Sequence, residues 1–307
     1  MNILIIKHGS IGDFVMSIGS IISIRSKFPN KKIYLLTTTI IKNIFFQIPY
    51  VDEIYIDDRK SNFDFIKYSI KLKKLNISLV IDLQNSQRTE IYHLCTRILY
   101  KNIKINSARK FAHFRYKIPP HGHEHVRDGL NNQLKLININ KFLEPNIDWL
   151  KNKCFKNPLK KKYIVLIPGS SKGGTKKRWP AICFSELSKI FIENNFDVIV
   201  TGAHSDLEIV QEIKSFNKKI IQSEYLSHFS NFIHLCNESS LIISVDTGPA
   251  QIAAFSDKPL IWLVKRGPYD LTNIPFSQKI HVIKAEKMEN IKVKEVAKVS
   301  MKILDIR

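Results

Sequence analysis

Short apolar runs alternate with longer amphipathic stretches along the first third of the chain. Residues 3–6 form an apolar run that is typical of a strand buried on both faces, and residues 14–28 carry apolar side chains at helical spacing. The same alternation predicts strands at 33–36, 51–56 and 79–83 and helices at 40–46, 63–75 and 87–99. Strands that alternate with helices indicate βαβ units and therefore a parallel sheet.

The pattern begins again after residues 152–162, a Lys-rich stretch with one proline that is typical of a linker. It predicts strands at 163–167, 198–201, 241–245 and 260–264, and helices at 180–194, 206–216, 249–255 and 293–304. We therefore expect an α/β protein with two Rossmann-like domains that face a cleft, at 1–155 and 156–290, and a helical segment at 291–307. Ligands of open parallel sheets bind at the carboxyl ends of the strands, so the candidate loops are those that follow Lys7, Ile167, Thr201 and Val245.

Composition narrows the classes of partner. The chain has 307 residues, enough for two domains of ordinary size, and 44% of them are hydrophobic, which excludes a disordered protein. Lys and Arg number 48 against 27 Asp and Glu, a formal net charge of +21. Such an excess favours nucleic acid, an anionic membrane surface or a phosphorylated substrate, although AT-biased coding also enriches a chain in Lys, Ile and Asn.

Cysteine usage and hydropathy bear on the compartment. The four cysteines are scattered without a C-x-x-C pair, which excludes a disulfide scaffold or a zinc ribbon and suits a reducing cytoplasm. There is no run of about 18 apolar residues, and the N-terminal residues enter a strand without a signal-peptide cleavage pattern. We therefore expect a cytoplasmic location.

The first candidate loop, residues 7–13, contains G-x-x-G but not the full G-x-G-x-x-G of a dinucleotide site. Gly9 and Gly12 let the backbone approach a ligand closely where the helix begins, and Gly12 is a candidate contact to the donor. Asp13 has two interpretations. It is either a carboxylate stabilised by the dipole at the helix N-terminus or a general base that faces the cleft.

The second candidate loop, residues 168–180, combines small residues, hydroxyls and cations after a strand, with Pro180 at the start of a helix. This composition is that of a phosphate cradle, although the P-loop spacing is absent. The alternative is a flexible charged loop. The candidate ligands in this loop are Ser170, Ser171, Thr175 and Lys177.

The third candidate loop follows Val245 and reads Asp246-Thr247-Gly248-Pro249. Free N–H groups at the start of the next helix can bind an anion such as a phosphate. The alternative is that Asp246 and Thr247 are simply an N-cap pair.

These three loops resemble the motifs of glycosyltransferase family 9, the bacterial heptosyltransferases, in order and in spacing. Residues 125–136 and 198–204 add weaker similarity, so the resemblance covers nearly the whole chain. It implies a GT-B type fold, with the acceptor in the first half and a nucleotide-sugar donor, usually ADP-heptose, in the second. It also implies that the C-terminal helix returns to the first domain.

The resemblance also implies roles for individual residues. Asp13 matches the catalytic aspartate of the family, and Lys177 matches a lysine that contacts the donor. Ser170 and Ser171 match hydroxyl residues that lie near the diphosphate in the family. Asp246, Thr247 and Gly248 match the donor loop of the family. The family usually has a histidine where this chain has Gln251, which can form hydrogen bonds but cannot carry charge. The family can place an acidic residue against the donor ribose. His204 stands at that position in this chain, with Asp206 and Glu208 nearby, so the role is not assigned.

Cations concentrate in residues 97–127, with aromatic residues between them. This segment is a solvated face, an RNA-binding patch or, as the resemblance suggests, a site for an acceptor with phosphates and carboxylates. For the acceptor we expect contacts from Arg109, Lys110, Arg115 and His125. His121, His123 and His125 can also be interpreted as a metal cluster, but a surface loop is the commoner outcome. No D-x-D pair occurs, so we expect no metal and no cofactor.

Together these features predict an inverting, metal-independent glycosyltransferase that moves heptose from an ADP-sugar to an acceptor of the lipopolysaccharide inner-core type. We expect a monomer, bound peripherally at the inner face of the cytoplasmic membrane, with no nucleic-acid partner. Two alternatives stay open. One is a non-catalytic protein that binds a nucleotide sugar, and the other is an RNA-binding α/β protein.

Overall fold

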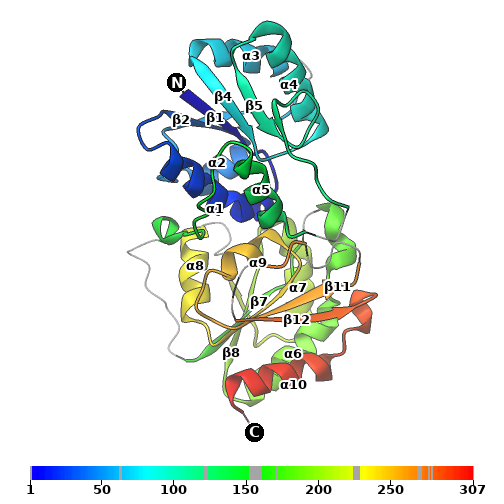
Figure 1. Cartoon of the computed structure of the whole chain (residues 1–307). Coiled ribbons are helices and arrows are strands. Elements are labelled where there is room, and N and C mark those ends of the chain that lie inside the picture. The colour runs from blue at the N-terminus through cyan, green and yellow to red at the C-terminus, as the bar shows by residue number, and fades with distance from the viewer. Residues whose placement is uncertain are drawn as a thin grey trace. The chain divides into compact units, whose positions relative to one another are not determined.

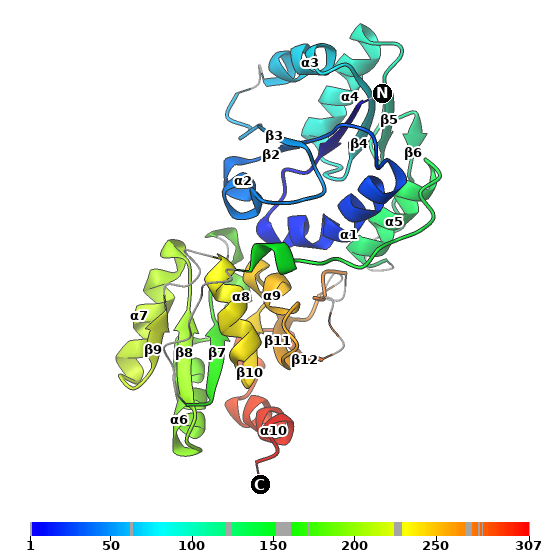
Figure 2. The same cartoon turned by 90° about the vertical axis from the view of Figure 1, so that its left-hand side faces the viewer.

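The computed structural model describes residues 2–61, 64–120, 124–151, 161–170, 172–223, 229–267, 272–275, 277 and 279–306. It divides into two compact units, Met1–Trp149 and Leu150–Arg307. Each unit is a parallel sheet with helices on its faces (Figures 1 and 2).

The sheet of the first unit has the strand order β3-β2-β1-β4-β5-β6, and all of its neighbouring strands are parallel. The strands are β1 (Asn2–Ile6), β2 (Ile33–Thr37), β3 (Glu53–Ile56), β4 (Ile77–Asp82), β5 (Lys104–Ser107) and β6 (Phe114–Arg115). The helices are α1 (Ile11–Lys27), α2 (Thr39–Phe45), α3 (Asp64–Lys74), α4 (Gln87–Leu99) and α5 (Val126–Lys135). The central strands β1 and β2 are buried almost throughout, as expected for apolar strands covered on both faces.

The sheet of the second unit has the order β12-β11-β10-β7-β8-β9, again fully parallel. The strands are β7 (Tyr163–Ile167), β8 (Asp197–Thr201), β9 (Ile221–Ser223), β10 (Leu241–Val245), β11 (Leu260–Lys265) and β12 (Ile280–Ala285). The helices are α6 (Ala181–Glu193), α7 (Leu207–Phe216), α8 (Phe229–Glu238), α9 (Gly248–Ala253) and α10 (Val293–Leu304).

Both sheets have the doubly wound order 3-2-1-4-5-6 when each is numbered from its own first strand. The topological switch point therefore lies between β1 and β4 in the first unit and between β7 and β10 in the second. Ligands of this fold bind outside the carboxyl ends of the strands at that point. The three candidate loops follow β1, β7 and β10, so each lies at a switch point.

The C-terminal helix α10 contacts α6 and β10 of the second unit. Val296 and Ala297 join a core that includes Trp179 and Phe184. The amphipathic pattern of the helix predicted a buried face, and this face packs on the core of the second unit. The implied return of the helix to the first domain stays a prediction.

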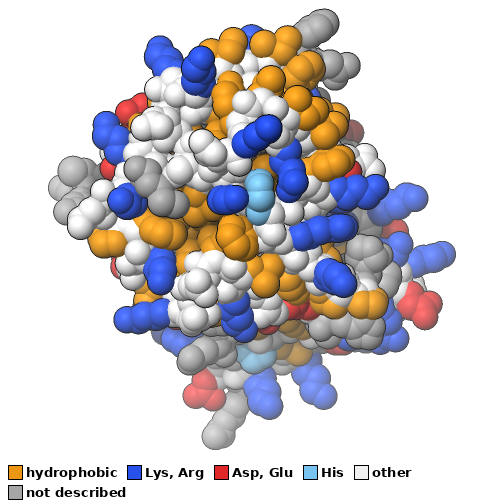
Figure 3. Space-filling model, turned by 45° about the horizontal axis from the view of Figure 1, so that its top comes forward, with side chains coloured by type: hydrophobic (Ala, Val, Ile, Leu, Met, Phe, Trp, Pro, Cys, Tyr) orange, Lys and Arg blue, Asp and Glu red, His pale blue; other side chains and the backbone are white. Residues whose placement is uncertain are grey.

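No helix in the part of the chain that the structure describes is long and apolar enough to cross a bilayer. Lys and Arg side chains are spread over the face shown in Figure 3, where Asp and Glu are sparse.

Candidate functional site

The loop after β1 is fixed by a side chain from the loop after β4. Oε1 of Gln84 accepts hydrogen bonds from the backbone N–H groups of His8, at 3.0 Å, and Gly9, at 2.7 Å. Glycine at position 9 also makes room for Asp13, because a Cβ atom there would lie 2.8 Å from Cβ of Asp13. The two loops are therefore joined at the switch point of the first sheet.

Asp13 forms a capping box with Ser10 at the start of α1. Oδ2 of Asp13 accepts hydrogen bonds from the Ser10 backbone N–H, at 3.2 Å, and from the Ser10 hydroxyl, at 3.0 Å. The backbone N–H of Asp13 donates to the Ser10 hydroxyl at 3.3 Å. The helix-terminal interpretation of Asp13 is thus confirmed as a structural role. The carboxylate is only half-buried, so it also keeps access to solvent. The predicted donor residue Gly12 is buried in the first turn of the same helix.

Behind this loop lies a buried network that sequence reasoning missed. Nε2 of His8 lies 3.0 Å from Oδ2 of Asp57, and both side chains are almost fully buried. The Tyr92 hydroxyl donates to the same Asp57 oxygen, and Nε of Arg88 donates to that hydroxyl at 2.8 Å. Asp57 directly follows β3, so its place at a strand end was a signal for it in the sequence.

The contacts in this network keep Asp57 ionised and Tyr92 protonated. Burial alone would raise the pKa of Asp57, but the His8 and Tyr92 side chains and the Arg59 backbone N–H outweigh burial and hold this pKa below its usual value. Burial and the bond to Asp57 raise the pKa of Tyr92, so the phenol stays protonated and donates. Asp57 is therefore a buried carboxylate that anchors His8 in the loop that leads to Asp13.

A second buried acid holds the loop that carries Gln84. One Asp82 oxygen accepts from the backbone N–H groups of Gln84, at 2.9 Å, and Asn85, at 3.0 Å. The other oxygen accepts from the Ser107 hydroxyl at 3.0 Å and lies 3.2 Å from Nε2 of His93. Burial opposes ionisation, but His93, the Asn85 backbone N–H and the Thr89 side chain keep the pKa of Asp82 below its usual value.

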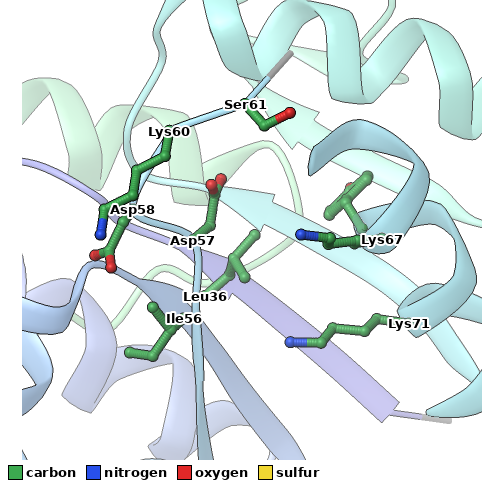
Figure 4. Close-up of a pocket in the computed structure, with 9 residues that line it drawn as sticks. Leu36, Ile56, Asp57, Asp58, Lys60, Ser61, Lys67 and Lys71 are labelled. Carbon is green, nitrogen blue, oxygen red and sulfur yellow. The ribbon is translucent and has the colours of Figure 1, made fainter. Parts of the chain in front are cut away.

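A basic pocket opens beside Asp57 in the first unit. It has a volume of about 290 Å³ and lies between the ends of β2 and β3 and the helix α3. Lys67 and Lys71 extend from α3 into it, and Asp58 and Lys60 border it on the other side (Figure 4). Burial lowers the pKa of Lys71, while the negative charge of Asp57 opposes this shift. Three lysines and the two carboxylates of Asp57 and Asp58 line the pocket, so cations outnumber anions by one. None of these lysines was among the predicted site residues.

The predicted acceptor residues are placed elsewhere. Nε of Arg109 donates to the Asn85 carbonyl at 2.6 Å, whereas Lys110 and Arg115 are exposed. His125 is the N-cap of α5, where Nδ1 accepts from the Arg127 backbone N–H at 3.1 Å. None of the four lines the pocket of Figure 4. His121 and His123 lie outside the described residues.

In the second unit, the loops after β7 and β10 meet through two predicted donor residues. Nζ of Lys177 lies 2.6 Å from Oδ2 of Asp246. The Lys177 side chain is 51% exposed, so its ammonium group stays accessible at the switch point. Thr247 is the N-cap of α9, and Gly248 and Pro249 form its first turn. The sequence thus brings a cation and a helix N-terminus to one edge of the sheet.

Hydrogen bonds between residues of the loop after β7 stabilise the rest of this loop. The buried Ser170 hydroxyl donates to the Gly174 carbonyl at 2.9 Å and accepts from Nε of Arg178 at 3.1 Å. Arg178 also lies 3.7 Å from a carboxylate oxygen of Asp206. Thr175 is exposed, and Ser171 lies outside the described residues.

Asp206, which the sequence left without a role, joins the loops after β7 and β8. Its carboxylate accepts from the Ala203 backbone N–H at 3.0 Å. A Cβ atom at Gly169 would lie 2.3 Å from Cγ of Asp206, so only glycine allows this contact. Burial raises the pKa of Asp206, while the Ala203 N–H and Arg178 oppose the shift.

The Gln251 side chain forms a hydrogen bond with the protein backbone. Its buried side chain donates from Nε2 to the Asn273 carbonyl at 2.7 Å. This bond needs a donor but no charge, which is a physical reason for glutamine to stand at this position.

The model of glycosyltransferase family 9 (heptosyltransferase) matches residues 67–302 of this chain. The chain belongs to glycosyltransferase family 9. Lipopolysaccharide heptosyltransferase 2 of Salmonella typhimurium is 29% identical over 129 residues, which are 39% of this chain and 36% of that protein. The aligned part thus spans about a third of the length of this curated relative.

Solved structures agree with this family 9 glycosyltransferase in fold. The Escherichia coli ADP-heptose lipopolysaccharide heptosyltransferase II superposes with a TM-score of 0.76 at 17% identity, covering 99% of this chain and 98% of that one. A family 9 glycosyltransferase from Veillonella parvula gives a TM-score of 0.79 at 17% identity, covering 99% and 97%. The predicted family and the predicted fold of two parallel-sheet α/β domains are therefore confirmed.

Proposed function

We propose that this family 9 glycosyltransferase transfers heptose from ADP-heptose to an anionic acceptor of the lipopolysaccharide inner-core type. The relatives with this fold include an ADP-heptose lipopolysaccharide heptosyltransferase. The observation that carries the proposal is the Lys177–Asp246 pair at the switch point of the second sheet. There a half-exposed ammonium group adjoins the first turn of α9.

Lys177 would bind the diphosphate of ADP and stabilise its charge as it leaves. An ammonium group and helix N–H groups are the donors that phosphate oxygens prefer. Asp246 orients Lys177 through the 2.6 Å contact, and the Arg178–Ser170 bond keeps the loop in shape. We propose that this cationic site makes a metal ion unnecessary for departure of ADP.

Asp13 would act as the general base. Its carboxylate takes the proton from an acceptor hydroxyl, and that oxygen attacks the anomeric carbon of heptose. The bond from this carbon to the ADP oxygen breaks on the opposite face, so the configuration inverts and ADP carries away the electron pair. The capping box with Ser10 fixes the carboxylate without burying it fully, which supports this role.

The acceptor would be bound by the first unit. The pocket lined by Lys60, Lys67 and Lys71 suits phosphate or carboxylate groups, and the exposed Lys110 and Arg115 remain candidates for further contacts. We propose that the enzyme works as a monomer at the cytoplasmic face of the inner membrane.

A donor screen tests the proposal directly. The melting temperature of the purified chain is measured in EDTA with ADP-, UDP-, GDP- and CMP-linked sugars. We expect ADP-heptose to give the largest rise, because ligand that binds only the folded state stabilises it. A larger rise with a UDP- or CMP-sugar, or no rise without a divalent metal, would contradict the proposed donor site.

A further inference from the structure

Two neighbouring helices of the first unit expose apolar side chains in stripes. In α3, Ile66 and Ile70 are four residues apart, and Ile70 is 61% exposed. In α4, Ile91, Leu94 and Ile98 follow each other at helical spacing, and Ile98 is 68% exposed. Residues at these spacings lie on one face of a helix. The buried faces of the two helices are formed by other residues, so these stripes are additional apolar faces.

The two helices lie side by side. The rings of Tyr68 in α3 and Tyr92 in α4 stack with centroids 4.5 Å apart. The Tyr100 hydroxyl, directly after α4, donates to the Ser69 carbonyl of α3 at 2.9 Å. Figures 1 and 2 both place α3 and α4 together at the same end of the first unit. We name their exposed apolar residues the α3–α4 surface; these are Ile66, Ile70, Ile91, Leu94, Ile98 and Leu99.

The charge around this surface is positive. Residues 64–104 contain eight Lys and Arg against three Asp and Glu, and one of these acids, Asp82, is fully buried. Lys73 and Lys74 are exposed at the end of α3, and Arg97 is exposed among the apolar residues of α4. In Figure 3 hydrophobic side chains gather on the face that comes forward, with Lys and Arg side chains among and beside them.

We propose that the α3–α4 surface docks on an anionic lipid bilayer. Apolar side chains interspersed with lysines suit the headgroup region, where the apolar groups leave water and the cations meet lipid phosphates. A protein partner would instead favour an apolar centre depleted of lysine. The observations therefore favour a membrane over a second protein surface.

The surface and the proposed acceptor pocket share the helix α3. Lys67 and Lys71 line the pocket from the same helix whose Ile66 and Ile70 face solvent. Docking through α3 would place the pocket next to lipid headgroups, where the sugar part of a glycolipid lies. This link to catalysis rests on the proposed function, whereas membrane binding itself does not.

Vesicle flotation tests the proposal with the full chain. The vesicles contain phosphatidylglycerol and phosphatidylethanolamine, or phosphatidylcholine alone as the uncharged comparison. We expect the wild type to float with the anionic vesicles and to dissociate at high salt. Ile70→Ser with Ile98→Ser should lower the vesicle partition coefficient by about tenfold or more. Lys73→Glu with Lys74→Glu should lower it similarly, on anionic vesicles only.

The matched control is Ile182→Ser with Phe216→Ser in the second unit, whose side chains are 40% and 45% exposed. It should float like the wild type. Equal binding by wild type and all variants, or no binding by the wild type, would overturn the proposal. So would a wild-type dimer that the Ile70→Ser and Ile98→Ser pair dissociates in sedimentation velocity, because the surface would then join two copies.

Turnover on a deacylated, water-soluble acceptor separates this proposal from the proposed function. We expect the surface variants to keep that turnover and to lose turnover on acceptor embedded in vesicles. A chain that floats normally but transfers no sugar to the soluble acceptor would refute the proposed function alone. A chain that transfers sugar but never binds vesicles would refute the docking and the proposed membrane location, while the proposed transfer reaction would stand.

Discussion

Nζ of Lys177 lies 2.6 Å from Oδ2 of Asp246, although 69 residues separate the two in the sequence. This ion pair joins the loops after β7 and β10 at the switch point of the second sheet. A phosphate that binds there must share the ammonium group of Lys177 with Asp246. Lys177 is thus the proposed phosphate ligand, and Asp246 is the residue that orients it.

Lys177→Ala should therefore weaken ADP binding by roughly 1–3 kcal/mol, because it removes a charge-assisted bond and leaves Asp246 to repel the diphosphate. Calorimetry with ADP in EDTA measures this loss. Lys176→Ala, at the exposed neighbouring position, is the matched control and should bind like the wild type. Equal losses from both variants would indicate a diffuse charge effect and not a site.

Asp13→Asn should lower kcat by ~10²–10⁴-fold, because asparagine cannot take the proton of the acceptor hydroxyl. Its amide oxygen can still accept from Ser10, so Tm and ADP affinity should change little. Ser10→Ala provides the opposite test, since it removes the cap and should cost about 0.5–2 kcal/mol of stability with a smaller effect on turnover. Near-normal turnover of Asp13→Asn would restrict Asp13 to its capping role.

Gln84→Leu should destabilise the first unit by roughly 1–3 kcal/mol, because the backbone N–H groups of His8 and Gly9 lose their acceptor. We also expect kcat to fall, because the loop that leads to Asp13 is no longer held. Gln84→Glu keeps an acceptor oxygen and should retain most of the stability. Thermal melts and steady-state kinetics of the two variants check this, and equal behaviour would argue against the hydrogen bonds as the cause.

Asp57 should make the free energy of unfolding depend on pH in the acidic range. Its folded pKa lies below the unfolded value of about 3.9, so the ionised carboxylate adds stability above that pH, and this stability is lost as the pH falls through the folded pKa. Asp57→Asn should therefore lower Tm most near neutral pH, and the difference from wild type should shrink toward about pH 3. Asp257→Asn, at an exposed position, should show no such trend. A Tm difference that stays constant with pH would contradict the low pKa.

The acceptor site can be located by kinetics. Lys67→Ala with Lys71→Ala should raise the acceptor KM by about tenfold and leave the donor KM nearly unchanged, with a defect that depends on salt. Lys110→Ala with Arg115→Ala removes the same charge from the exposed segment that the sequence favoured. A larger effect from this second pair would return the acceptor to the segment predicted from charge alone.

The central strands could be predicted from the sequence because they are buried on both faces. β1, β2, β7 and β10 are nearly continuous apolar runs, and this pattern has few other interpretations. The edge strands could not be predicted in the same way. β6 has two exposed residues, and β9 is three residues long with one buried side chain, so neither carries a periodic signal.

Candidate residues could be named from the sequence where one loop carries them, but not where the order of strands in the sheet brings them together. Asp13, Lys177 and Asp246 stand in local motifs, whereas the role of Gln84 depends on β1 pairing with β4, which lies 75 residues on. The acceptor contacts predicted in the basic segment 97–127 stay a prediction, because charge count does not show which cations line a pocket. Lys67 and Lys71 do so because α3 crosses beside the end of β3.

A transfer assay with ADP-heptose in EDTA tests the central claim most directly. The purified chain is mixed with the donor and a deacylated inner-core acceptor, and ADP release, product mass and anomeric configuration are measured together. Our account predicts one ADP released for each heptose transferred, an inverted anomeric centre and a rate that EDTA does not change. Retained configuration, strict dependence on a divalent metal, or no transfer despite ADP-heptose binding would contradict it.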